Sequence, residues 1–166
     1  MTPLQEDLFP DGAMRRDAVL SPDGAYRYAL RRSWGSGPPV MFICLNPSTA
    51  DHLTDDPTLR RCISLALRWG FESVAMGNLF ALRSSDPREL EKAPDPVGPE
   101  NDEWLKRLVE ESDTIVAAWG NGGALLDRGP LIQERFPNLM CLGRTKLGQP
   151  RHPLYVKGET ELIPLA

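Results

Sequence analysis

Amide, hydroxyl and carboxylate side chains directly follow an apolar run in the segment VMFICLNPSTADHLTDDPT, residues 40–58. The apolar part, residues 40–45, has the continuous hydrophobic character of a strand that is covered on both faces. An amide or a carboxylate can hold a water molecule for attack, and hydroxyl groups can bind polar ligands. The segment therefore predicts the floor of a site for a small molecule or a nucleotide, formed by Asn46, Pro47, Ser48, Thr49 and Asp51.

Three later predicted strands also end in polar or glycine-rich residues. These strands span residues 73–80, 114–119 and 139–142. Ligands of parallel sheets bind beyond the carboxyl ends of the strands, where several strand ends lie close together. We therefore expect one shared site that also includes Asn78, Arg83, Gly120, Asn121, Arg144 and Lys146, with Arg151 and His152 from the following loop.

The order of the predicted elements determines the expected fold class. Hydrophobic periodicity predicts helices over residues 57–69 and 100–111, a third helix that ends near Phe136, and strands over 25–34, 40–45, 73–80, 114–119, 139–142 and 153–157. Such alternation is typical of an α/β domain. We expect a three-layer αβα sandwich with a central, largely parallel sheet, in which residues 21–166 form a single domain after an N-terminal tail of residues 1–20 that need not be ordered.

The composition limits the classes of protein to which the chain can belong. Of its 166 residues, 41% are hydrophobic and 25% are charged, which predicts a folded core. No apolar run approaches the ~20 residues that cross a membrane, and the beginning of the sequence lacks an apolar signal core. With three widely spaced cysteines, two histidines and no CxxC motif, we expect reduced core thiols in a cytoplasmic protein without a metal site or a cofactor.

The charge distribution weighs against a general nucleic-acid binder. The net charge is −4, whereas tight non-specific binding depends on basic residues that neutralise phosphates. Between Glu134 and Glu159, however, all charged residues are basic. This segment could face phosphate groups, and the alternative is a chance cluster of charges on one surface.

Each motif also has a purely structural interpretation. Asn46-Pro47 could simply terminate a strand, and Asp55 and Asp56 are typical of the first residues of a helix. The loop of residues 120–123 is similar to a phosphate-binding loop before a helix, but it matches neither GxGxxG nor GxxxxGK[ST]. His152 could be an exposed loop residue without a role, unless it points into the same cleft as the first motif.

Several motifs together resemble a known family. The segments FICLNPSTAD, DDPTLRRC, NLFALRSSDP, DPVGPEND, AAWG and GQPRHPLY occur in this order. They closely resemble a bacterial and phage family that is catalogued as domain of unknown function 1643. The resemblance covers residues 26–155 and implies the family, but it implies no activity.

A more distant resemblance implies a reaction. Uracil-DNA glycosylases and their relatives are three-layer α/β domains, and Asn46-Pro47 is similar to their water-positioning motif. The likeness implies that Asn78 reads a base edge, and that Arg151-His152-Pro153 corresponds to the superfamily's late His-Pro-Ser motif, with Leu154 in place of the serine. No aromatic residue is identified that would stack on a base.

The sequence therefore predicts a protein that is directed at a nucleobase, a nucleotide or a short nucleic acid, with N-glycosidic bond hydrolysis as the implied reaction. Asn46 and Asp51 would position water, Asn78 would read the base, and His152 with Arg151 would stabilise charge. The remaining residues named above would bind the substrate. This interpretation requires that Asn46, Asn78 and His152 line one cleft.

Three alternatives remain open at this point. The chain could be a non-catalytic nucleotide or nucleic-acid binding module. It could be a metal-assisted hydrolase in which Asp51, Asp55 and Asp56 surround a hard cation such as magnesium. Finally, the loop could be structural only, and the protein could act through surface contacts.

Overall fold

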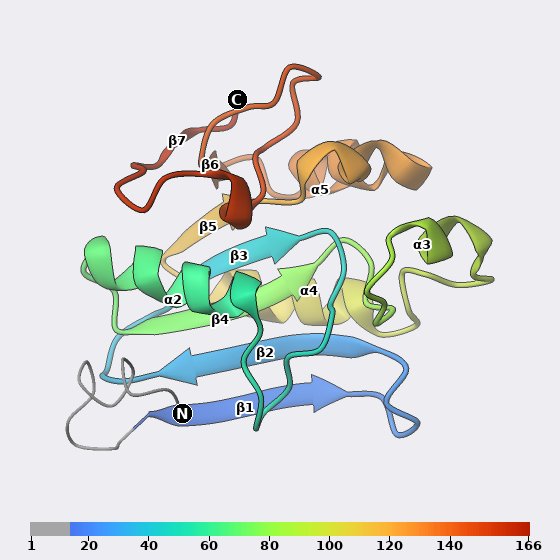
Figure 1. Ribbon diagram of the computed structural model, residues 1–166, viewed down its shortest axis with the longest axis horizontal. Helices are drawn as coiled ribbons and strands as arrows, with labels where there is room; N and C mark the ends of the chain where they lie inside the picture. Colours follow the sequence, from blue (N-terminus) through green and yellow to red (C-terminus); the bar gives the residue numbers. More distant parts are fainter. Residues whose placement is uncertain (1–13) are drawn as a thin grey trace.

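A seven-stranded mixed sheet forms the centre of the computed structural model, which describes residues 14–166. The strands lie in the order β1-β2-β4-β3-β5-β6-β7 (Figure 1). They are β1 Arg15–Leu20, β2 Arg27–Ser33, β3 Val40–Cys44, β4 Ser73–Asn78, β5 Thr114–Ala117, β6 Met140–Cys141 and β7 Ile163–Pro164. The helices are α2 Pro57–Arg68, α3 Arg88–Lys92, α4 Asn101–Glu111 and α5 Arg128–Arg135, with the 3-10 segments η1 Gly120–Asp127 and η2 Pro153–Tyr155.

Only the middle of the sheet is parallel. β4, β3, β5 and β6 run in one direction, whereas β1, β2 and β7 are antiparallel to their neighbours. The prediction of a largely parallel sheet is therefore wrong for the outer strands. β2 and β3 lie on either side of β4 and are joined by the turn of residues 34–39, which is too short for the crossover that strands running in the same direction need. As a result, the first residue of β2 lies at the same edge of the sheet as the last residues of β3 and β4.

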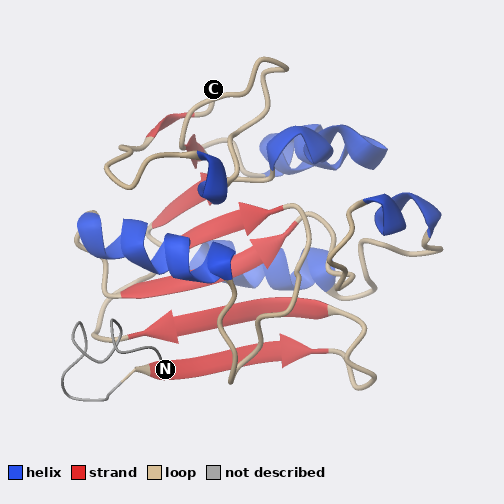
Figure 2. Ribbon diagram, in the orientation of Figure 1, coloured by secondary structure: helices blue, strands red, loops and turns tan. Residues whose placement is uncertain are grey.

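Helices cover both faces of the sheet (Figure 2). The buried side chains of α2 pack with those of β3 and β4 on one face, and the buried side chains of α4 and α5 pack with the other face. This arrangement confirms an α/β architecture. The three cysteines are free and buried, as expected of core thiols. Within residues 14–166, no helix is both long and apolar enough to cross a membrane.

The connections between the parallel strands diverge at one place. From β3 the chain passes through α2 on one face to β4, whereas from β5, on the other side of β3, it passes through α5 on the opposite face to β6. Beyond the carboxyl ends of β3 and β5 the two loops therefore separate. Open α/β sheets bind their ligands in the crevice at such a point.

The beginning of α2 agrees with its prediction from the sequence. The Asp56 carboxylate accepts a hydrogen bond from the Leu59 N–H at 2.8 Å, and Pro57 is the first residue of the helix. Proline is favoured there because that N–H has no partner within a helix. Asp56 is thus fixed at the end of the loop that follows β3, with its second carboxylate oxygen near the sheet edge.

Several other elements differ from the prediction. The predicted helix after residue 123 is instead η1 followed by α5, because Leu126 and Asp127 adopt left-handed φ angles of 51° and 55° that interrupt it. The predicted strand 153–157 is the short turn η2. Residues 15–20 of the predicted tail form β1, and residues 1–13 of that tail lie outside the described residues.

A buried ion pair attaches the loop after β3 to the neighbouring strand β2. Arg32 is fully buried and contacts the Asp55 carboxylate at 3.0 Å. Its guanidinium also donates to the backbone oxygen of Asp51 at 2.5 Å. A buried guanidinium without a carboxylate partner is costly, so this contact should hold the loop firmly in place.

The Asp55→Ala substitution should therefore destabilise the protein by about 3 kcal/mol, because it leaves the buried Arg32 charge uncompensated. As a control, Glu103→Ala removes one partner of an exposed pair with Arg107 and should cost no more than about 0.5 kcal/mol. Urea unfolding followed by circular dichroism measures both values. Equal losses in the two variants would contradict this role of Arg32.

Candidate functional site

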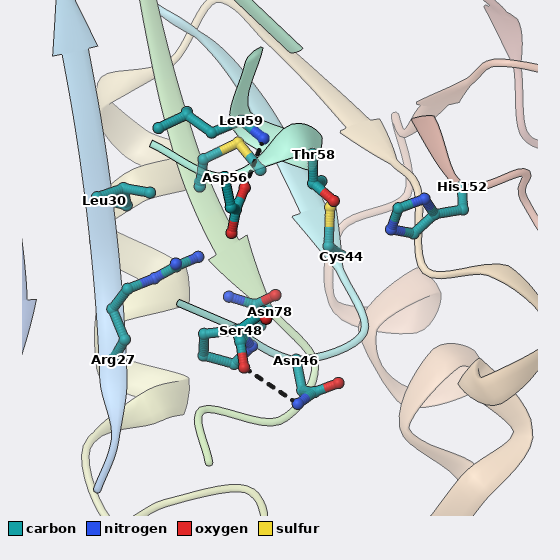
Figure 3. A pocket seen from close by; sticks show the side chains of 12 residues that line it. Arg27, Leu30, Cys44, Asn46, Ser48, Asp56, Thr58, Leu59, Asn78 and His152 are labelled. Carbon is teal, nitrogen blue, oxygen red and sulfur yellow. Dashed lines mark hydrogen bonds between the residues drawn. The ribbon is translucent and has the colours of Figure 1, made fainter. Parts of the chain in front are cut away.

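An inner pocket lies at the carboxyl ends of β3 and β4 (Figure 3). Its polar lining comes from Arg27, Asn46, Ser48, Asp56, Thr58, Asn78 and His152, and Leu30, Cys44, Pro47, Leu59 and Met76 complete it. The cavity volume is about 40 Å³. One water molecule needs about 10–15 Å³ measured in this way, so the cavity holds a few water molecules or a few atoms of a ligand.

An outer groove of about 280 Å³ continues from this pocket. It is lined by Leu45, Asn46, Pro87, Trp119, Gly120, Asn121, His152 and Tyr155. Asn46 and His152 belong to both hollows. The groove lies between the residues that follow β3 and those that follow β5, which is the crevice that the topology predicts.

Asn46 lines both hollows, and its amide nitrogen is bound by the backbone. Its Nδ2 donates to the backbone oxygens of Ser84 at 3.0 Å, Pro47 at 3.2 Å and Leu82 at 3.3 Å. These bonds fix the orientation of the amide, and Figure 3 shows the oxygen on the side that faces His152. A fixed acceptor of this kind can orient a water molecule or a ligand N–H.

Asn78 places an unused hydrogen-bond donor in the inner pocket. It is the last residue of β4, where it pairs with Cys44 of β3, and its side chain is buried. Its Nδ2 has no hydrogen-bond partner. A buried amide nitrogen without a partner costs about 1–3 kcal/mol, so a group that accepts from it would bind favourably.

His152 lines the pocket as a neutral donor. Burial lowers the pKa of His152 below its ordinary value, although the Asp56 carboxylate acts in the opposite direction. Its Nδ1 accepts from the Leu154 N–H at 3.1 Å, which places the proton of the neutral ring on Nε2. Arg61 of α2 donates to the backbone oxygens of Pro153 and Val156 and so holds this turn against the helix.

Two charged residues of the inner pocket were not among the predicted catalytic or substrate-binding residues. Arg27 is the first residue of β2, and its side chain is buried. Asp56 was interpreted as a helix cap or, in the metal-assisted alternative, as a metal ligand, and it also lines the pocket. Burial lowers the pKa of Arg27 to about 10, and the Asp56 carboxylate opposes this shift. The guanidinium therefore remains charged at neutral pH.

Asp51 does not line any of these hollows. Its carboxylate accepts from the N–H groups of Leu53 and Thr54, both at 2.8 Å, and the first of these bonds is the main cause of its lowered pKa. It closes the turn of its own loop. The geometry therefore does not support the predicted role of Asp51 in holding water beside Asn46.

A side groove of about 440 Å³ contains other predicted binding residues. It is lined by Gly24, Ala25, Ser48, Thr49, Leu82, Arg83, Ser84 and Ser85, and it meets the inner pocket at Ser48. Arg83 donates only long hydrogen bonds, of 3.3 and 3.4 Å, to two backbone oxygens. Its guanidinium is thus available to a ligand in this groove.

The loop of residues 120–123 is not arranged as a phosphate cradle. The Gly120 N–H donates to the Pro150 oxygen at 2.8 Å, and the Asn121 side chain accepts from Thr145 at 2.6 Å. A Cβ atom at Gly123 would lie 2.1 Å from the ring of the buried Trp119, so glycine is required there for packing. Residues 120–123 are themselves the beginning of the 3-10 segment η1 and do not precede an α-helix directly.

The predicted basic residues do not converge on the pocket. Arg144 donates to the backbone oxygens of Pro164 and Leu165 and thereby secures the C-terminal strand. Lys146 and Arg151 are exposed, and the Arg151 side chain lies over Gly143. None of the three lines the inner pocket or either groove.

The three acidic residues of the loop after β3 do not form one cluster either. Asp51 closes a turn, Asp55 pairs with Arg32, and Asp56 caps α2. Across residues 14–166 there is no group of three His, Cys, Asp or Glu side chains that could hold a metal ion. The geometry therefore does not favour the metal-assisted alternative.

Comparison with known protein families identifies the family of this chain. A family model described as "Protein of unknown function (DUF1643)" matches residues 27–154. The chain belongs to the DUF1643 family. The matched range begins at Arg27 and ends at Leu154 in η2, so the DUF1643 region contains every residue of the inner pocket and omits β1 and β7. No curated protein and no solved structure matches the chain.

The protonation state of His152 can be measured directly. In a His52→Gln variant, His152 is the only histidine, so its ring gives a single set of NMR signals. We expect these signals to titrate with a pKa below 6.5, because burial disfavours the charged ring. The Nε2 proton should persist at neutral pH, and a titration midpoint above 6.5 would contradict the neutral form.

Proposed function

We propose that this DUF1643 protein binds a nucleobase, free or within a nucleotide or short nucleic acid, and hydrolyses its N-glycosidic bond. The observation that carries the proposal is that Asn46, Asn78 and His152, from three separate segments, line one pocket. The distant resemblance to uracil-DNA glycosylases implies related roles for these three residues. The proposal does not depend on a metal ion or a cofactor.

The dimensions of the two hollows suggest how a base would lie. A whole base does not fit into 40 Å³, but its polar edge does, and the ring would then occupy the outer groove of 280 Å³. Tyr155 lines this groove and is 79% exposed, which provides the aromatic surface that the sequence alone did not identify. A base could stack against it.

The reaction needs a positioned water molecule and a stabilised leaving group. The Asn46 oxygen would accept a hydrogen bond from water and direct it at the anomeric carbon. The C–N bond breaks with its electron pair on the base, and the His152 Nε2–H would donate to the negative charge that develops there. The water oxygen bonds to the sugar, and the proton it releases ends on the departing base.

A second candidate function is binding without chemistry. The observation that favours it is the position of Asp51, which closes its own turn and lines neither of the hollows that Asn46 lines. A carboxamide can orient water but cannot accept its proton. The non-catalytic alternative therefore stays open alongside hydrolysis.

Ligand binding and base release together test both candidates. We expect one class among nucleobases, nucleosides, nucleotides and short oligonucleotides to raise the melting temperature, since a ligand at about 100 times its Kd adds about 2.7 kcal/mol. Asn78→Ala should abolish this shift, whereas Asn46→Ala and His152→Ala should mainly abolish release of the base, measured by chromatography.

The exposed Asn138 lies outside the site, so Asn138→Ala is the matched control and should behave as the wild type. Binding without any release of base would favour the non-catalytic module. If no ligand of any class binds, both candidate functions are wrong.

A further inference from the structure

Arg27 and Asp56 carry opposite charges into the inner pocket but do not touch. Their side chains are 4% and 9% exposed. No ion pair within 4.0 Å joins them in the described part of the chain. Figure 3 shows that they reach the cavity from different elements, Arg27 from β2 and Asp56 from the residue before α2.

Backbone hydrogen bonds keep the two charges apart. Arg27 Nη1 donates to the Ala50 oxygen at 3.0 Å. Asp56 is held by the Leu59 N–H at 2.8 Å and more weakly by the Ala50 N–H at 3.4 Å. Each group is thus fixed by the main chain in a position where the two charges do not meet.

The pocket therefore has a donor side and an acceptor side. Arg27 Nε and Asn78 Nδ2 are both buried and have no hydrogen-bond partner. Asp56 Oδ2 has only the long bond from Ala50, so it can accept another hydrogen bond. A buried charge whose hydrogen-bonding capacity is unfilled costs free energy until a ligand or water supplies the missing partner.

We infer that Arg27 and Asp56 determine specificity by admitting the edge of a neutral group that carries an acceptor next to a donor. A nucleobase edge of the type O=C–NH or N=C–NH₂ would accept from Arg27 and Asn78 and donate to Asp56. This inference deepens the proposed function, on which the identity of the ligand as a nucleobase rests.

Charged groups are excluded by the same pair. An anion such as a phosphate or a carboxylate would be attracted by Arg27 but repelled by Asp56, so the loss of its hydration would not be repaid. A cation would be attracted by Asp56 but repelled by Arg27, so the loss of its hydration would not be repaid either. The two opposite charges make the pocket nearly neutral as a whole, which leaves phosphate groups of a nucleotide outside it.

Three small planar probes of equal size separate these cases. Formamide is neutral with an adjacent acceptor and donor, formate is an anion and formamidinium is a cation, and each has three heavy atoms that suit a cavity of about 40 Å³. Titrating them into the full-length protein while following the side-chain amide NMR signals of Asn78 and Asn46 measures their affinities. We expect formamide to bind at least about tenfold more tightly than either ion, because each ion is repelled by one of the two charged residues of the pocket.

Substitution of one of the two charged residues should change which probe binds most tightly. Asp56→Asn keeps a good helix cap but leaves Arg27 unopposed, so formate should become the preferred probe by about tenfold. Asp56→Ser, which also caps a helix, should behave in the same way. The double variant Arg27→Met/Asp56→Asn removes both charges and should again prefer the neutral probe.

Asp113→Asn makes the same chemical change at an exposed residue beside the opposite end of β5, and it should leave the wild-type preference intact. Equal binding of formate and formamide to the wild type would overturn the inference, and so would an unchanged preference in Asp56→Asn. A wild type that binds none of the probes would also overturn it, because ordered water then fills the pocket.

The outcome for the proposed function is read separately. If formamide is preferred as expected but no nucleobase binds, the inference holds for the pocket and the proposed function is wrong. If nucleobases bind while the probes show no preference, the proposed function holds and the charge pair does not select the ligand.

Discussion

The site depends on how strand β2 holds the loop between β3 and α2. Two arginines of β2 reach this loop: Arg27 donates to the Ala50 oxygen, and Arg32 donates to the Asp51 oxygen and pairs with Asp55. Without these contacts a polar loop of this length would have many conformations, each with the site residues in different places. The buried guanidinium groups therefore convert a flexible connection into a fixed wall of the pocket.

The same constraint explains why one carboxylate can serve both structure and recognition. Asp56 must accept from the Leu59 N–H, because the first turn of a helix has backbone donors without partners. Once Oδ1 is used in this way, the direction of Oδ2 is determined, and it faces the cavity into which Arg27 and Asn78 project. The N-terminus of α2 thus orients a pocket residue, while the backbone contact of Arg27 prevents the two charges from neutralising each other directly.

The sequence was sufficient for those site residues that follow parallel strands. Asn46 and Asn78 were found because strand ends can be recognised from apolar runs, and ends of parallel strands meet at one edge. Arg27 could not be found in this way, because it begins its strand. Only the antiparallel pairing of β2 with β4 brings that first residue to the site, and pairing direction was not encoded in the local pattern.

Other misassignments have equally local causes. Asp51 was expected to position water together with Asn46, but an aspartate can also accept from N–H groups two and three residues later, and here it does. The glycines of residues 120–123 suggested a phosphate loop, although Gly123 is required by the close approach of the Trp119 ring. Composition identifies such residues as unusual, but only tertiary contacts decide between a binding role and a packing role.

The distribution of charge in the pocket also limits the chemistry that it could catalyse. The groups that would stabilise the leaving base carry little net charge. They are an imidazole held in its neutral form by burial, an amide, and a guanidinium whose charge is opposed by a carboxylate. One well-placed donor contributes about 2.7–4 kcal/mol to a transition state, and Asp51, which was expected to position water with Asn46, closes its own turn instead. Such a site suits a glycosidic bond whose base already leaves readily, because the protein would need to add only positioned water and one donor. A base with a poor leaving tendency would be bound through its polar edge and released unchanged.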